Sequence, residues 1–293
     1  MNKIKGTGVA LVTPFNKNGS IDYNSLKNLL NHVITGGVDY LVLLGTTGES
    51  VSLSLKEKLD IIKFCIDYNK KRLPIVVGLG GNNTSKVIDE IRNLNFEGID
   101  AILSVSPFYN KPSQEGIYQH FKKISNHSPV PIIIYNVPGR TSSNISANTT
   151  IRLASDFNNI IAIKEASGDI LQVMDIIRNK PDNFIVLSGD DALTLPMIYL
   201  GADGVISVIG QSHPKQFSNM VKYAISGKNK KANLIHFGLY DFLKPIYIEG
   251  NPVGIKACLE KLGICKSFVR LPLVEATENV KNKLHHLLNS TSK

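Results

Sequence analysis

The sequence predicts an α/β protein, a (β/α)8 TIM barrel with a C-terminal helical appendage. Eight short apolar segments recur along the chain, and stretches with apolar residues at helical spacing separate most of them. The repeat of roughly 20 to 35 residues is the length of a strand, a helix and two loops. No Gly-x-Gly-x-x-Gly motif follows the first segment, which counts against an open dinucleotide-binding sheet.

The apolar segments are the expected strands of the barrel. They are apolar without alternation, as strands buried on both faces are. The segments are Gly8–Thr13, Tyr40–Leu44, Ile75–Gly78, Ala101–Val105, Ile132–Tyr135, Ile160–Lys164, Ile185–Ser188 and Val205–Val208. Between the first two, helical spacing occurs at Leu26, Leu29, Leu30 and Val33. The pair Gly36-Gly37 then ends this first predicted helix.

The strand signal fades after Gly227, and helix-like segments replace it. These segments are Leu234–Leu243, Val253–Leu262 and Val274–Leu288. No low-complexity linker separates the two parts. We therefore divide the chain into a barrel at 1–225 and a helical region at 226–293.

Composition narrows the classes of function. The net charge of +9 suggests a protein that binds nucleic acid. However, the lysines are dispersed, and the sequence has neither zinc-finger spacing nor an aromatic-basic platform, so no nucleic-acid partner is expected. An anionic substrate explains a basic surface equally well. No apolar run reaches the roughly 20 residues that span a bilayer, so no membrane association is expected. Three cysteines without close spacing favour reduced thiols, and the cytoplasm is the expected location.

The end of the sixth segment is the first candidate for chemistry. The apolar run ends on Lys164, and small polar residues follow it. A lysine with a buried stem at the rim of a core is desolvated, which favours the neutral, nucleophilic amine that a Schiff-base enzyme needs. The alternative is a lysine at the edge of the core that simply extends to water.

Other polar side chains follow the predicted strands at the same end. In a TIM barrel, chemistry collects where the strands end. The sequence places there Gly45–Ser50, Ser106–Pro112, Tyr135–Thr141, Lys164 and Ser188–Asp191. This set holds a lysine, tyrosines, threonines and an arginine, but no His pair at metal spacing and no nucleophilic cysteine. It predicts a mouth rich in proton-transferring groups and without a metal.

Five ordered motifs make the chain similar to a known family. They are Gly45–Glu49, Ser106–Pro112, Tyr135–Thr141, Lys164–Gly168, and Asn251-Pro252 with Lys256. On a barrel pattern, this order and spacing resembles the pyruvate-dependent class I aldolases, a family of (β/α)8 lyases. The likeness runs from Gly6 to about Pro272.

The resemblance implies a role for each catalytic residue. Lys164 is expected to form an imine with the ketone of pyruvate, so that no separate cofactor is needed. Tyr135 is expected to carry protons beside the imine, and Thr46 to link it to Tyr109 through hydroxyl groups. In the family, the tyrosine equivalent to Tyr109 reaches into a neighbouring subunit's site. A homo-oligomer is therefore expected, a tetramer arranged as a dimer of dimers.

The resemblance also implies the residues that bind substrate. Thr47 and its backbone are expected to hold the carboxylate of pyruvate. Arg140 is expected to bind the carboxylate of an aldehyde substrate with its planar guanidinium. Gly189 and Ile206 are expected to contribute backbone groups. For the neighbouring Asp190 and Asp191 we expect solvated or helix-capping roles.

Family members differ mainly in the aldehyde that they accept. N-acetylneuraminate lyase and the keto-deoxy sugar acid aldolases take long polyhydroxylated substrates and usually lack the continuation seen at Pro138–Thr141. Arg140 suits a short aldehyde with its own carboxylate. The resemblance thus implies condensation of pyruvate with aspartate 4-semialdehyde, with a sugar acid aldolase as the alternative.

One departure from the family concerns feedback by lysine. Feedback-sensitive members bind lysine near the positions of Ser50 and Asn82 and of the residue before Tyr109. They commonly carry histidines, a glutamate and a tyrosine where this chain has Leu55, Lys58, Lys86 and Phe108. A lysine in place of the glutamate repels the ammonium group of the ligand. We expect weak or absent inhibition by lysine.

Overall fold

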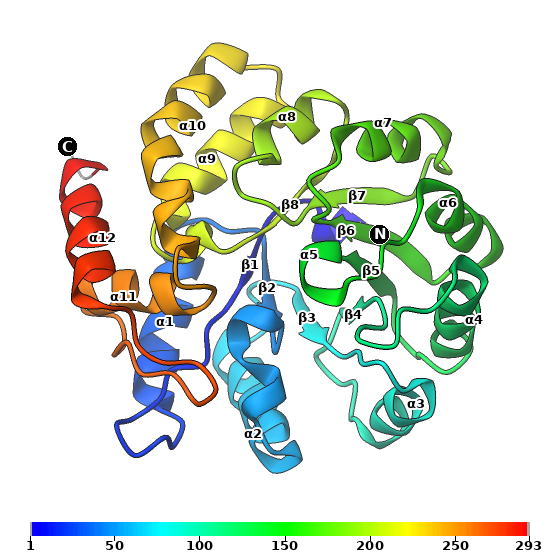
Figure 1. Cartoon of the computed structure of the whole chain (residues 1–293), viewed down its shortest axis with the longest axis horizontal. Coiled ribbons are helices and arrows are strands. Elements are labelled where there is room, and N and C mark those ends of the chain that lie inside the picture. The colour runs from blue at the N-terminus through cyan, green and yellow to red at the C-terminus, as the bar shows by residue number, and fades with distance from the viewer. Residues whose placement is uncertain (1, 292–293) are drawn as a thin grey trace.

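The computed structural model describes residues 2–291, so Met1, Ser292 and Lys293 of the two predicted regions lie outside the described residues. Parallel strands β1 to β8 close into a barrel in chain order (Figure 1). Their bounds are β1 Gly6–Ala10, β2 Tyr40–Leu43, β3 Ile75–Gly78, β4 Ala101–Val105, β5 Ile132–Asn136, β6 Ile160–Glu165, β7 Ile185–Ser188 and β8 Gly204–Ser207. The predicted TIM barrel is confirmed.

Helices connect the strands and cover the outside of the barrel. They are α1 Tyr23–Thr35, α2 Leu55–Asn69, α3 Thr84–Asn93, α4 Gln114–Ser125, α5 Pro138–Thr141, α6 Ala147–Asp156, α7 Ile170–Asn179, α8 Thr194–Tyr199 and α9 Pro214–Ile225. Several begin where a short polar side chain accepts a backbone N–H of the first turn. At α2, Ser54 and Glu57 bond reciprocally in a capping box.

Side chains from alternate strand positions fill the barrel interior. Val42, Val76, Leu103, Ile133 and Leu187 belong to one buried cluster inside the strands. Successive side chains of a strand point to opposite faces, so residues two positions apart share the interior. This alternation sets which residues at the strand ends face the mouth of the barrel.

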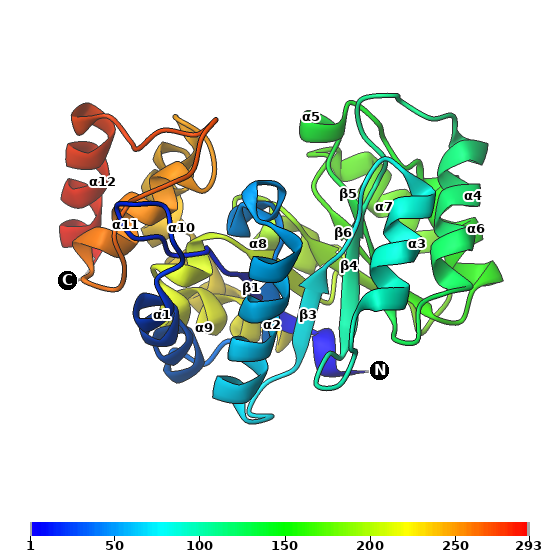
Figure 2. The ribbon, with the colours of Figure 1, turned by 90° about the horizontal axis from the view of Figure 1, so that it is seen from below.

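The C-terminal helices lie at one end of the molecule. They are α10 Asn229–Leu243, α11 Val253–Lys261 and α12 Glu278–Thr291. In Figure 1 and Figure 2, α11 and α12 lie near α1 and far from α4 and α6. One apolar core contains Leu26 of α1, Phe217 of α9, Leu239 of α10, Leu259 of α11 and Leu284 of α12. The helical region therefore packs into the same core as the barrel.

The strand predicted at Gly8–Thr13 begins and ends earlier in the structure. Gly6 and Thr7 have little apolar signal but pair with Gly204 and Val205 of β8. Leu11 and Val12 are buried in a loop, and the N–H of Val12 donates to Gln211 Oε1 at 2.8 Å. An apolar run indicates that residues are buried, and here the buried residues continue past the end of the strand.

No helix within residues 2–291 combines the length and apolarity that crossing a membrane requires.

Candidate active site

Lys164 and Tyr135 lie side by side at the mouth of the barrel. They are paired in register across β5 and β6 and are each 7% exposed. Lys164 Nζ lies 4.2 Å from the centre of the Tyr135 ring. Ala162 and Ile133, two residues earlier on each strand, belong to the interior cluster, so both side chains point inward. The structure thus places a buried amine directly over a phenol ring.

Lys164 has no acidic partner in the described part of the chain. No carboxylate between residues 2 and 291 lies within 4.0 Å of its amine. Glu165, the next residue, points to the other face of β6 and is bonded there by Asn136 and Gln172. The electron-rich face of Tyr135 is the nearest group that favours a cation.

Gly189, directly after β7, makes room for the lysine. A Cβ atom at this position would lie 3.0 Å from Lys164 Cε and 2.7 Å from the Cβ of Ala166. Only glycine therefore allows β7 to pass this close to the lysine stem. Ile206 of β8 is 1% exposed and belongs to the same interior cluster as Tyr135.

Thr46 and Thr47 form a tight turn after β2, in the short 3-10 helix η2 Thr46–Gly48. Thr46 is exposed, whereas Thr47 is 3% exposed. The turn is anchored on both sides. Thr13 Oγ1 donates to the carbonyl of Gly48 at 2.7 Å, and Asn251 Nδ2 donates to Thr47 Oγ1 at 2.9 Å. The hydroxyl of Thr47 is thereby held in one place.

A cavity of about 810 Å3 opens at this mouth. Thr46, Tyr135 and Arg140 line it, whereas Lys164, Gly189 and Ile206 are not on its wall. Arg140 lies on α5, is exposed, and has no ion-pair partner among residues 2–291. A cation free of acidic partners on the wall of a cavity can receive an anionic substrate.

The cavity continues outward into a groove between α2 and α3. Leu55 and Lys58 of α2 and Lys86 of α3 line this part, together with Phe108 and Ser50. The carbonyl of Phe108 also accepts a hydrogen bond of 3.2 Å from Asn82 Nδ2. The residues that the sequence associated with lysine feedback therefore gather in this groove.

Tyr109 is separated from the other predicted catalytic residues. Its side chain is 89% exposed, its backbone is left-handed with φ at 71°, and it is not on the cavity wall. Within the described residues of this single chain, no hydrogen bond joins it to Thr46. Only Thr46 and Tyr135 of the expected hydroxyl series line the same cavity.

Glu165 is a site residue that sequence reasoning missed. It is 1% exposed, and its carboxylate accepts hydrogen bonds from Asn136 Nδ2 at 2.9 Å, from the N–H of Ser167 at 2.6 Å and from Gln172 Nε2 at 3.0 Å. Burial raises the pKa of Glu165, and these donors oppose the shift. Asn136 in turn accepts the N–H of Ile145, which holds the loop behind α5.

Asp191 departs from the expected solvated role. It is 2% exposed, and its Oδ2 accepts the backbone N–H groups of Val208 and Ile209 at 3.0 and 2.8 Å. The hydroxyl of Tyr247 lies 3.3 Å from the same oxygen. Burial raises the pKa of Asp191. Asp190 bonds locally, accepting the N–H of Ala192 at 2.8 Å.

Acidic, histidine and cysteine side chains do not assemble into a possible metal site anywhere in residues 2–291. Of the predicted site residues, Lys164, Tyr135, Thr46, Thr47 and Arg140 lie at this end of the barrel. This set can form a covalent bond with a ketone, transfer protons and bind carboxylates.

Comparison with known proteins assigns the family. The sequence model of the dihydrodipicolinate synthetase family matches residues 3–291. The chain belongs to the dihydrodipicolinate synthetase family. The family resemblance inferred from the five motifs is confirmed.

Individual members of the family are similar over the whole chain. The 4-hydroxy-tetrahydrodipicolinate synthase of Flavobacterium psychrophilum is 52% identical, with 100% of both chains covered. The crystal structure of dihydrodipicolinate synthase from Thermotoga maritima superimposes with a TM-score of 0.97 at 36% identity, covering 99% of each chain. The crystal structure of the chloride-inhibited dihydrodipicolinate synthase from Acinetobacter baumannii, complexed with pyruvate, superimposes with a TM-score of 0.95 at 37% identity. The match covers 99% of each chain.

Proposed function

We propose that the chain condenses pyruvate with L-aspartate 4-semialdehyde to give 4-hydroxy-tetrahydrodipicolinate, a reaction of lysine and diaminopimelate biosynthesis. One observation carries the proposal. The amine of Lys164 lies over the ring of Tyr135 at the mouth of the barrel, and no carboxylate of the described residues neutralises it. The names of the related synthases support this reaction over that of a sugar acid aldolase.

Lys164 supplies the covalent chemistry. Its neutral amine adds to the ketone carbon of pyruvate, and loss of one water molecule gives the imine. The imine accepts the electron pair left when the methyl group loses a proton. The resulting enamine carbon attacks the aldehyde, which forms the new carbon–carbon bond. The amino group of the aldehyde substrate then displaces Lys164 from the imine carbon, which closes the ring and frees the enzyme. In this proposal the covalent imine on Lys164 does the work of a cofactor, and no separate cofactor takes part.

The neighbouring residues bind and transfer protons. Tyr135, whose ring centre lies 4.2 Å from the amine, donates and accepts the protons of imine formation in this proposal. Thr46 and Tyr109 complete the proton path in an assembled enzyme. Thr47 binds the carboxylate of pyruvate, and Gly189 and Ile206 contribute backbone groups to substrate binding. Arg140 binds the carboxylate of the aldehyde from the other wall of the cavity.

Tyr109 supports an assembly of several copies. It is 89% exposed and does not line the cavity of its own chain, so its side chain is available to complete the site of a second copy. We place the enzyme in a homotetramer, a dimer of dimers in which Tyr109 crosses one interface. Buried, unpaired thiols at Cys65, Cys258 and Cys265 suit the reducing cytoplasm, where we place the protein.

The test is steady-state turnover of pyruvate with aspartate semialdehyde, run beside pyruvate with N-acetylmannosamine. Lys164→Ala gives the background. We expect turnover with the semialdehyde alone. Turnover only with the sugar would instead favour the reaction of N-acetylneuraminate lyase. Turnover with neither, together with failure of borohydride to trap pyruvate, would refute the role of Lys164.

Arg140→Ala tests the choice of aldehyde. Loss of a charge-assisted, two-point hydrogen bond is expected to raise the KM for the semialdehyde roughly tenfold or more. The KM for pyruvate is expected to change less, because pyruvate is held by the Thr47 turn. Arg152→Ala, a change at an exposed arginine on α6, is the matched control. Equal increases in both KM values would contradict the proposed role of Arg140.

A further inference from the structure

The turn that carries Thr46 and Thr47 ends on a buried glutamate. Glu49 directly follows η2, has a left-handed backbone with φ at 51°, and is only 4% exposed. Its N–H donates to the carbonyl of Thr46 at 3.1 Å, which closes the turn. A non-glycine residue in this conformation needs support from its surroundings. The position of the Thr47 hydroxyl therefore depends on what holds Glu49.

A fully buried lysine from α11 holds it. Lys256 Nζ donates to Glu49 Oε1 at 2.6 Å and to the carbonyl of Phe268 at 2.7 Å, and it lies 4.3 Å from the centre of the Phe15 ring. Lys256 is 0% exposed. The other carboxylate oxygen of Glu49 accepts the backbone N–H of Arg270 at 3.0 Å. Both oxygens of Glu49 are thus bound by the C-terminal region.

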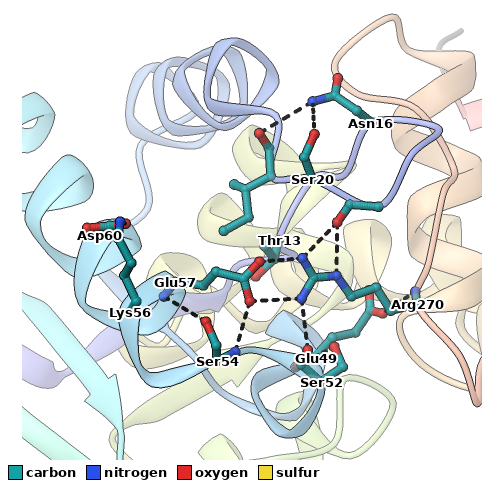
Figure 3. Close-up of polar contacts among 12 residues, drawn as sticks. Thr13, Asn16, Ser20, Glu49, Ser52, Ser54, Lys56, Glu57, Asp60 and Arg270 are labelled. Carbon is teal, nitrogen blue, oxygen red and sulfur yellow. Dashed lines mark hydrogen bonds and ion pairs between the residues drawn. The ribbon is translucent and has the colours of Figure 1, made fainter.

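Arg270 extends this support to two further loops. Its side chain forms a forked ion pair with Glu57 of α2, with Nη1 and Oε2 separated by 3.0 Å. The same guanidinium donates to the carbonyls of Ser52 and Gly19 at 2.8 and 2.7 Å. Figure 3 shows Arg270 between Glu57 on one side and the segment near Ser20 on the other, with Glu49 and Ser52 beside it. The segment that follows the turn and the loop at Gly19 are therefore fixed to one arginine.

The C-terminal region also contacts the turn directly. Asn251, two residues before α11, donates through Nδ2 to Thr47 Oγ1 at 2.9 Å. Lys256 and Asn251 thus approach the same turn from one segment, 251–256. Asn251 bonds the hydroxyl of Thr47, and Lys256 bonds the carboxylate two residues later.

A buried ion pair rarely stabilises a protein more than apolar side chains of similar volume. It does fix orientation: three hydrogen bonds, from Lys256 to Glu49 and to the carbonyl of Phe268 and from the N–H of Arg270 to Glu49, hold one rotamer of Glu49. That rotamer in turn holds one conformation of the turn. A pair with that property, at the turn that faces the cavity, fits a role in positioning better than a role in stability alone.

We propose that Lys256 and Glu49 are positioning residues that set the Thr46–Gly48 turn for the carboxylate of pyruvate. This inference rests on the proposed function, in which Thr47 binds that carboxylate. Without the ion pair the turn relaxes from its left-handed end, and pyruvate loses a preformed binding site. The aldehyde is bound by Arg140 of α5 and is affected far less.

The experiment compares Lys256→Met, Glu49→Gln and the double variant with the wild type. The first readout is the pyruvate concentration that gives half-maximal borohydride trapping, and the second is the pair of KM values. We expect each variant to raise the half-saturating pyruvate concentration and the KM for pyruvate about tenfold, equal to about 1.4 kcal/mol. The KM for the semialdehyde is expected to stay within about twofold of wild type.

The double variant separates positioning from stability. It leaves no single buried charge, so its thermal midpoint should recover relative to Lys256→Met. Its affinity for pyruvate should not recover, because neither side chain holds the turn. The double variant also keeps the test available if Lys256→Met fails to fold. Recovery of pyruvate affinity together with stability would overturn the proposal.

Leu259→Ala on the same helix is the matched control. Leu259 is 0% exposed, and its truncation lowers stability by leaving a cavity without touching the turn. We expect a lower thermal midpoint and an unchanged half-saturating pyruvate concentration. If Leu259→Ala weakens pyruvate binding as much as Lys256→Met does, the ion pair has no special role.

Trapping also separates this inference from the proposed function. A wild-type enzyme that traps pyruvate but does not use the semialdehyde contradicts the proposed reaction, and the trapping series still tests the positioning role. A wild type that performs the reaction, with variants that bind pyruvate normally, contradicts only the positioning role.

Discussion

Lys164 and Lys256 are both buried, at 7% and 0% exposure, yet their surroundings differ. Lys256 Nζ lies 2.6 Å from the carboxylate of Glu49 and also bonds a backbone carbonyl. Lys164 Nζ faces the ring of Tyr135, with no carboxylate of the described residues in ion-pair reach. Burial is therefore common to both lysines, and the difference lies in whether a fixed carboxylate holds the amine.

The two lysines also differ in access. Neither lysine is on the cavity wall, but Lys164 lies against Tyr135, which is. Lys256 is instead enclosed by Glu49, the Phe15 ring and the carbonyl of Phe268. One lysine is arranged to form a bond with substrate, and the other to hold the backbone that substrate contacts.

Replacing Lys164 should have the largest effect. Lys164→Ala removes the amine that forms the imine, and kcat is expected to fall roughly 10³-fold or more. Lys164→Arg keeps a cation but cannot form an imine with a ketone and should be equally inactive. Steady-state turnover and borohydride trapping of pyruvate measure both variants. Trapping that persists in Lys164→Ala would show that another lysine, such as Lys256, is the nucleophile.

Crowding Lys164 should have the next largest effect. In Gly189→Ala, the new Cβ lies 3.0 Å from Lys164 Cε and 2.7 Å from the Cβ of Ala166, so the lysine must move. A displaced nucleophile is expected to lower kcat roughly 10- to 100-fold. Gly238→Ala on α10 is the control, because a Cβ there meets no atom within 4 Å. A kcat equal to wild type in Gly189→Ala would mean that the close approach of β7 is unimportant.

The ion pair between Glu57 and Arg270, which lies beside the Lys256–Glu49 pair, should lose its stabilising effect in acid. The hydrogen bonds from Arg270 lower the pKa of Glu57 from 4.5 to about 2. A carboxyl with a lowered pKa in the folded state stabilises the protein fully above about pH 4.5, and this contribution is lost as the pH falls through about 2. Because the pair is partly exposed to solvent, we expect a modest effect.

Urea unfolding of wild type and Glu57→Gln at pH values from about 6 to about 2 measures this effect. This range spans the ordinary and the lowered pKa of the carboxyl group. The wild type should be more stable at the upper end, and the difference should shrink as the pH falls. Glu278→Gln, at an exposed glutamate of α12, is the control. A difference that stays constant over this range would show that the Glu57–Arg270 pair does not stabilise the fold.

The barrel itself could be predicted closely from the sequence. The apolar segments Ile75–Gly78, Ala101–Val105 and Ile185–Ser188 match β3, β4 and β7 residue for residue. Strands buried on both faces have a local signature, since each residue must be apolar or small. The sequence predicts the first strand too far along the chain, because Leu11 and Val12 are apolar and buried beyond the end of β1.

The candidate site can be predicted from the sequence where it lies on strand ends or directly after them. Lys164 and Tyr135 could be located because each ends an apolar run. The contact between Glu49 and Lys256 joins residues 207 positions apart, and no local pattern predicts such a pair. Lys256 was recognised within a motif, but its partner and its purpose required the structure. Likewise, the bonds from Asn136 to Glu165 and from Tyr247 to Asp191 join residues 29 and 56 positions apart.

The groove between α2 and α3 extends the comparison to two lysines that line a cavity. Lys58 and Lys86 line the groove together with Leu55 and Phe108, and the acidic side chains Asp89 and Glu90 line it as well. A lysine ligand carries an ammonium group, which Lys86 repels where feedback-sensitive relatives commonly carry an acid. We therefore expect free lysine to inhibit weakly or not at all, the smallest effect among these predictions.

Turnover of pyruvate and semialdehyde across a lysine titration measures this expectation. Lys86→Glu is the sharpest variant, because it replaces the repelling cation at this position with an acidic side chain and should increase sensitivity to lysine. Lys215→Glu on α9, an exposed position outside the groove, is the matched control. Sub-millimolar inhibition of the wild type would show that charge at Lys86 does not decide binding. The groove would then recognise lysine through other contacts, such as the backbone carbonyls near Phe108.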